Sequence, residues 1–207
     1  MKVSRLVALA AAVGTAATAQ AQTIHFVGSN VGCFYTTTVC SPGSSTTTPV
    51  SDTHVLSYTG STFDTYTSDG YVGIGGNAGT PNVNNLGSFT LAPGSYNYIS
   101  HPEYFVLTTT FTAPTNTNVV FTSTVVGSVS NRGGGVTIDF DNTPQTITYA
   151  GGSFQYAVND ISLNTQQLTR DANGYIINAT STVPEPSSMA LLGTGLVGLV
   201  PMFRRKK

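Results

Sequence analysis

The sequence has few charges and no tryptophan. Only 8% of its 207 residues are charged, against about a quarter in ordinary globular proteins. Between residues 23 and 182 only Arg132 and Arg170 are basic, and eight residues are acidic, so this segment carries a formal charge of -6. A nucleic-acid-binding protein neutralises phosphates with clustered Lys and Arg. The missing basic residues therefore exclude nucleic acid as a partner.

The sequence motifs of common hydrolases are missing too. The chain contains neither a Gly-x-Ser-x-Gly nor a His-Glu-x-x-His sequence. Glu103 is the only glutamate between residues 23 and 182, which leaves no persuasive carboxylate pair for glycoside cleavage. His25, His54 and His101 lack the spacing of metal ligands. We therefore expect a non-enzymatic protein with no cofactor.

No interior stretch of useful length has the 3.6-residue apolar period of a helix. Short runs alternate instead, and residues 136–141 place every second, apolar side chain on one face. Residues 104–111 and 118–126 are further strand candidates, and Asp69-Gly70 is typical of a type I′ hairpin turn. We expect residues 22–182 to form one all-β domain, an antiparallel β-sandwich of jelly-roll or immunoglobulin-like type.

The N-terminal segment, residues 1–21, has the three-part pattern of a secretion signal. Lys2 and Arg5 make its start positive, and an Ala-rich apolar stretch follows as a signal helix. Small residues at positions 19 and 21 suit cleavage between Ala21 and Gln22, and a second site two residues earlier stays open. We expect the mature chain to start at Gln22.

The C-terminal segment, residues 183–207, also has three parts. Pro184-Glu185-Pro186 favours an extended peptide, because proline disfavours helix at the residue before it. An uncharged run follows, in which we expect a single transmembrane helix over residues 188–203. This helix is short for a hydrocarbon core of about 30 Å, but snorkelling basic side chains can cover the gap. The positive-inside rule then holds the basic tail in the cytoplasm: Arg204, Arg205, Lys206 and Lys207.

The order and spacing of these C-terminal parts resemble the PEP-CTERM sorting signal of Gram-negative bacteria. The resemblance implies that the membrane enzyme exosortase cuts near Pro184-Glu185-Pro186. It implies exosortase and the export machinery as partners, with the inner membrane as a transient one. The expected location is the cell surface or the extracellular space, in a setting of exported polysaccharide.

Two sets of interior residues are candidate sites. Cys33 and Cys40 are the only cysteines, and an oxidising compartment favours a disulfide between them. The loop-entropy model assigns this disulfide roughly 2–3 kcal/mol. Asp139, Asp141 and Asp160 are candidate calcium ligands, because carboxylate oxygens suit that ion. A solvated acidic face that protects a strand edge is the competing interpretation.

Three functions remain open for the interior domain. The leading one is a non-catalytic protein of the cell surface or extracellular matrix. A carbohydrate-binding module, with or without calcium, is the first alternative, and Tyr96 and Tyr98 on one strand face are its best local indication. A secreted hydrolase with an unrecognised site is the second.

Overall fold

The fold is all-β. A computed structural model describes residues 23–43, 45–75 and 84–181, and none of these residues is helical. In the same part of the chain, no helix has the length and hydropathy needed to cross a membrane. The strands are β1 (His25–Tyr35), β2 (Val50–Ser51), β3 (Leu56–Thr59), β4 (Ser61–Tyr66), β5 (Val72–Ile74), β6 (Ser88–Leu91), β7 (Tyr96–Asn97), β8 (Glu103–Ala113), β9 (Thr117–Ser130), β10 (Gly133–Phe140), β11 (Gln145–Tyr149), β12 (Gly152–Val158), β13 (Ile161–Asn164), β14 (Thr169–Asp171) and β15 (Gly174–Ser181).

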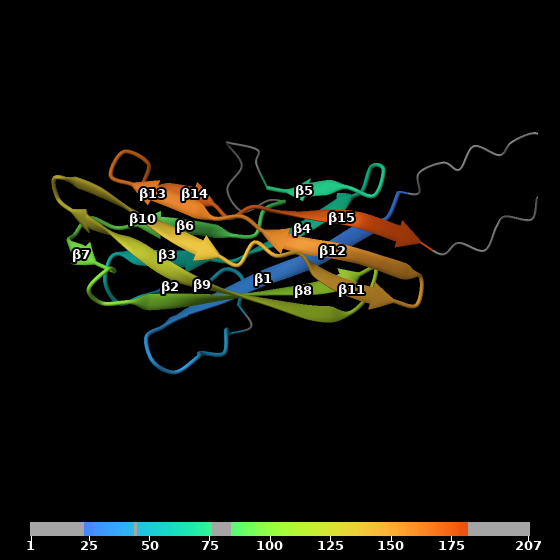
Figure 1. Cartoon of the computed structure of the whole chain (residues 1–207), viewed down its shortest axis with the longest axis horizontal. Coiled ribbons are helices and arrows are strands. Elements are labelled where there is room, and N and C mark those ends of the chain that lie inside the picture. Colours follow the sequence, from blue (N-terminus) through green and yellow to red (C-terminus); the bar gives the residue numbers. More distant parts are fainter. Residues whose placement is uncertain (1–22, 44, 76–83, 182–207) are drawn as a thin grey trace, which may run out of the picture.

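The strands form three sheets, and every pair of neighbours is antiparallel. The largest sheet has seven strands in the order β13-β10-β9-β8-β1-β4, with β7 paired to β9. The two four-stranded sheets run β11-β12-β15-β5 and β14-β6-β3-β2. The described chain enters at the start of β1 and leaves at the end of β15, and both points lie at the end of the molecule opposite β7 (Figure 1).

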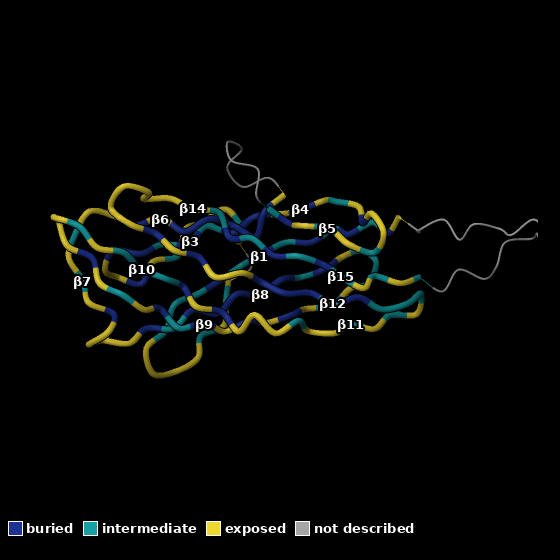
Figure 2. The backbone as a smooth tube through the Cα atoms, turned by 45° about the horizontal axis from the view of Figure 1, so that its top comes forward, coloured by how far each residue is buried: buried dark blue, intermediate teal, exposed yellow. Residues whose placement is uncertain are grey.

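An aromatic core joins both small sheets to the same face of the large one. Phe111 on β8 packs edge-on against Phe154 on β12, with ring centroids 5.2 Å apart. Nearer the start of β8, Phe105 contacts Phe89 on β6, with ring centroids 4.9 Å apart. All four rings are fully buried, and each contributes about 1.5–3 kcal/mol through burial. Figure 2 shows this buried centre with exposed backbone along β7 and β11.

Alternation along β1, which lies between β8 and β4, explains how this strand fits under the core. From His25 to Gly32, half-buried and buried residues alternate, because successive side chains of a pleated strand point to opposite faces. Gly32 points toward the core, where an added Cβ would lie 2.1 Å from Cζ of Phe105. The Phe105 ring is itself held by Phe34, Tyr58 and Phe89, at 4.8–4.9 Å. Only glycine therefore fits at this position.

Gly32→Ala is expected to lower the free energy of unfolding by about 1–3 kcal/mol, because the trapped Phe105 ring has to shift. Gly43→Ala is the matched control, since nothing lies within 4 Å of an added Cβ there. We expect the control to change stability by less than about 0.5 kcal/mol. Urea unfolding of the two variants measures the difference. Equal stabilities would contradict the packing argument.

The structure confirms the predicted all-β, antiparallel fold. The strand candidates at 104–111 and 118–126 fall within β8 and β9, and the candidate at 136–141 lies in β10 except for Asp141, which follows the end of that strand. At the predicted hairpin turn, Asp69 and Gly70 have φ of 53° and 76°, the positive values that a type I′ turn needs. Only the bridge between Ser68 and Tyr71 closes this turn, because the flanking strands β4 and β5 pair with β1 and β15 and do not form a hairpin with each other. The jelly-roll or immunoglobulin-like type stays a prediction. The predicted signal helix in residues 1–21 and the predicted transmembrane helix over residues 188–203 lie outside the described residues.

Candidate functional site

A tight turn between β2 and β3 places the first buried carboxylate. Asp52 Oδ1 accepts hydrogen bonds from the backbone N of His54 at 2.7 Å and of Leu56 at 3.1 Å. The backbone N of Asp52 donates to Leu56 O at 3.0 Å, and Thr53 between them has a φ of 72°. Aspartate suits such a turn because its short side chain bonds the backbone a few residues ahead. The turn thus fixes both Asp52 and His54.

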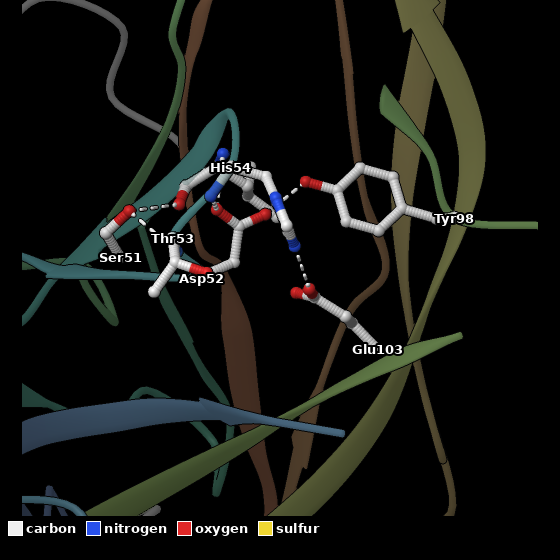
Figure 3. A network of polar contacts seen from close by, with 7 residues as sticks. Ser51, Asp52, Thr53, His54, Tyr98 and Glu103 are labelled. Atoms are coloured by element: carbon white, nitrogen blue, oxygen red, sulfur yellow. Dashed lines mark hydrogen bonds and ion pairs between the residues drawn. The ribbon is translucent and has the colours of Figure 1, made fainter. Parts of the chain in front are cut away.

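The other oxygen of Asp52 binds a buried tyrosine. Asp52 is 6% exposed, and its Oδ2 accepts a hydrogen bond from the hydroxyl of Tyr98 (Figure 3). Burial and this bond to the carboxylate raise the pKa of Tyr98 well above its ordinary value. Tyr98 therefore remains a hydrogen-bond donor throughout the physiological pH range. Asp52 has three donors in all, which offset the cost of burying its charge.

Glu103, the first residue of β8, supplies a second buried carboxyl group. The residue is 2% exposed, and its Oε1 lies 3.2 Å from Nε2 of His54 (Figure 3). Its other oxygen, Oε2, is buried without a hydrogen-bond partner. Burial, and secondarily the charge of Asp52, raise the pKa of Glu103 to about 7. The carboxyl group therefore changes its protonation near neutral pH.

An aromatic stack extends from this polar cluster to the surface. The His54 ring lies parallel to the Tyr96 ring, with centroids 3.8 Å apart and an interplanar angle of 16°. Tyr98 meets Tyr96 edge-on at 4.7 Å, and His101 lies tilted at 5.9 Å. The backbone of His54 is fixed by its bond to Asp52, and its ring is fixed by the contact with Glu103. The cluster consequently fixes the orientation of Tyr96.

Tyr96 also forms part of the wall of an open hollow of about 440 Å³. The hollow lies beside β7, at the end of the molecule opposite the chain's entry and exit (Figure 1). Neither buried carboxylate lines it. The residues that do are Ser95, Tyr96, Asn97, His101, Ser128, Val129, Ser130 and Gly133. The arrangement can therefore orient an aromatic wall, while no carboxylate of the cluster reaches the space where a ligand would sit.

The predicted cysteine pair is close in space. Cys33 at the end of β1 and Cys40 in the following loop are joined by a disulfide, with Cα atoms 6.3 Å apart. The pair lies on β1 and its following loop, apart from the residues that line the hollow.

The calcium candidates do not form a common site. Asp139 is exposed on β10, and Asp141 follows the end of that strand, where Oδ1 accepts a bond from Thr143 N at 3.0 Å. Asp160 Oδ1 accepts from Phe140 N at 2.9 Å, and Oδ2 from Asn142 Nδ2 at 3.3 Å. Within the described ranges, no three or more His, Cys, Asp or Glu side chains are placed to hold a metal ion. Asp160 serves instead to bind the end of β10.

The two tyrosines that the sequence groups together have different environments. Tyr96 lines the hollow, whereas Tyr98 is 1% exposed and bound to Asp52. Tyr98 therefore cannot act as a surface platform. Sequence reasoning missed the cluster of Asp52, His54 and Glu103, because its members come from separate segments. The only local signal is the Asp-x-His spacing of the turn.

Comparison with known proteins identifies one segment. Residues 182–207 match the family model of the PEP-CTERM protein-sorting motif. These residues include Pro184-Glu185-Pro186 and the four basic residues of the tail. No curated protein and no solved structure matches the chain. The β domain therefore has to be interpreted from its own residues.

Proposed function

We propose that this protein, which carries a PEP-CTERM sorting motif at residues 182–207, is a non-catalytic component of the cell surface or extracellular matrix. The motif indicates an exported protein that exosortase sorts. This match is the observation that carries the proposal. The β domain is then the part delivered to the outside.

The route begins with removal of residues 1–21 and a mature start at Gln22. The apolar run 188–203 holds the chain transiently in the inner membrane, with Arg204 to Lys207 on the cytoplasmic side. Exosortase then cuts near Pro184-Glu185-Pro186. The matched segment directly follows the end of β15 at Ser181, so cleavage there leaves the described sheets intact.

Three features of the domain support the proposal that it lies outside the cytoplasm and is not catalytic. The disulfide of Cys33 and Cys40 suits an oxidising compartment. The low charge and the buried aromatic core suit a static structural domain. Asp52 and Glu103 are 6% and 2% exposed, so these carboxyl groups are withheld from a substrate. The proposed partners are exosortase and the export machinery.

The mass of the protein recovered from the cell surface tests this proposal. The intact chain has a mass of 21.5 kDa. We expect a smaller product that starts at Gln22 and ends near Pro184, plus any group that exosortase transfers. A panel of hydrolase substrates should give no turnover. Recovery of the intact chain from the cytosol, with both cysteines reduced, would refute the proposal.

A further inference from the structure

The hollow beside β7 combines an aromatic wall with uncharged polar groups. Tyr96 and His101 supply rings, and Val129 adds a small apolar surface. Hydroxyl and amide side chains make up most of the remainder: Ser95, Asn97, Ser128 and Ser130. No lining residue is Asp, Glu, Lys or Arg. The lining therefore suits a neutral ligand with both an apolar face and hydrogen-bonding groups.

Several of these polar groups have no hydrogen-bond partner in the part of the chain that the structure describes. Among the described residues, no hydrogen bond involves the hydroxyl of Ser95, the hydroxyl of Ser128 or Nδ2 of Asn97. Asn97 Oδ1 accepts bonds from the backbone N of Ile99 at 3.0 Å and of Ser100 at 3.3 Å. These two bonds fix the amide and leave its Nδ2 free to donate. The hollow thus offers one amide donor and two hydroxyl groups to a ligand.

The aromatic wall is held in place from behind. His54 stacks on Tyr96 with ring centroids 3.8 Å apart, and Tyr98 packs against Tyr96 in a T-shaped arrangement with centroids 4.7 Å apart. His54 is itself bound to Glu103, and Tyr98 to Asp52. A side chain fixed by packing and by such supporting bonds loses little conformational entropy when a ligand binds. The buried cluster thus fixes the position of Tyr96, although its carboxylates do not themselves line the hollow.

We propose that this hollow binds a pyranose ring of a neutral oligosaccharide. A pyranose has an apolar C–H face for an aromatic side chain and a rim of hydroxyl groups for Ser and Asn. The volume of 440 Å³ lies within the range of about 300–1,000 Å³ for small-molecule sites. The charge of -6 over residues 23–182 repels anionic polysaccharides. The site therefore selects uncharged sugars.

The position of the hollow keeps it accessible. It lies beside β7, and the described chain enters and leaves at the opposite end (Figure 1). A chain held at its C-terminal end therefore presents the hollow to the surroundings. The binding site does not depend on the sorting route, because it is formed within the described β domain alone.

Titration with cellotriose, maltotriose and triacetylchitotriose, all of which are uncharged, tests the site. The full chain is purified in a detergent without a sugar headgroup, and binding is followed by calorimetry. We expect at least one of the three to bind with a Kd below about 1 mM, which is a modest affinity. The absence of binding by all three at about ten times that concentration would overturn the proposal. Failure here would leave the surface mass measurement unaffected, so the two proposals fail separately.

Two variants locate the binding. Ser128→Trp fills the hollow from an exposed position on β9 and should weaken binding at least about tenfold, as should Tyr96→Ala. Tyr71→Ala is the control, because Tyr71 is 55% exposed and is not among the residues that line the hollow. Ser128→Trp retains every core side chain, so it decides the question if Tyr96→Ala fails to fold. Wild-type affinity in Ser128→Trp would place the sugar elsewhere and refute the assignment.

Discussion

Replacing Pro184, Glu185 and Pro186 together with alanine is expected to abolish sorting and to leave the protein in the inner membrane. The triplet lies at the start of the matched segment, between the folded domain and the apolar run. Each proline disfavours helix at the residue before it, and we expect the membrane enzyme to take up this segment as an extended peptide. Alanine permits helix instead, and the acidic side chain is lost. We expect nearly all of the protein to shift from the surface fraction to the membrane fraction.

Cell fractionation followed by immunoblotting measures this shift. The matched control is Thr180→Ala, a nearby change on β15 that precedes the matched segment and should leave sorting intact. The sorting role would be refuted if the triple-alanine variant reached the surface in wild-type amounts. Degradation is distinguished from retention by the total amount of protein in the lysate.

Glu103→Gln is expected to make the protein more stable above neutral pH. Burial raises the pKa of Glu103 from 4.5 to about 7, so the folded state holds a proton that the unfolded state releases. Below pH 4.5 both states are protonated and the side chain imposes no penalty. Between pH 4.5 and about 7 the unfolded state releases this proton while the folded state keeps it, so stability falls across this range and stays at the lower level above 7. Glutamine resembles the protonated acid and avoids this loss.

The expected gain in stability of Glu103→Gln follows from the difference between the pKa of Glu103 in the folded and the unfolded state. A shift from 4.5 to about 7 corresponds to about 3 kcal/mol at most. At pH 8.5 Glu103→Gln should exceed wild type by up to about this amount, and at pH 4.5 the two should agree within about 1 kcal/mol. The groups that face Glu103 are His54, Asp52, Tyr96 and Tyr98. Glutamine can still accept the bond from His54, so packing is retained.

Urea unfolding between pH 4.5 and 8.5 measures how the stability of wild type and of Glu103→Gln depends on pH. Asp139→Asn is the control for removal of an acidic charge, because Asp139 is exposed on β10. We expect its stability to follow the pH dependence of wild type. If wild type and Glu103→Gln gave parallel curves, the buried carboxyl would not be the group that titrates.

The local sequence was sufficient to predict β8, β9 and β10, although it did not single out the long strand β1. In 136–141 every second residue is apolar, and this period alone specifies a strand with one buried face, which is β10. Asp69-Gly70 predicted its turn for an equally local reason, since these residues tolerate positive φ. The C-terminal motif was also readable without a structure, because its parts follow each other directly in the chain.

The tertiary structure alone decided which residues meet. Asp52 and Tyr98 are 46 residues apart in the sequence, yet one hydrogen bond joins them. Period-two alternation says that two side chains share a face, but it does not say what covers that face. For this reason Tyr96 and Tyr98 looked equivalent in the sequence, whereas packing buried one and left the other on the wall of the hollow. Contacts between distant strands set burial, hydrogen bonding and pKa, and no local pattern contains them.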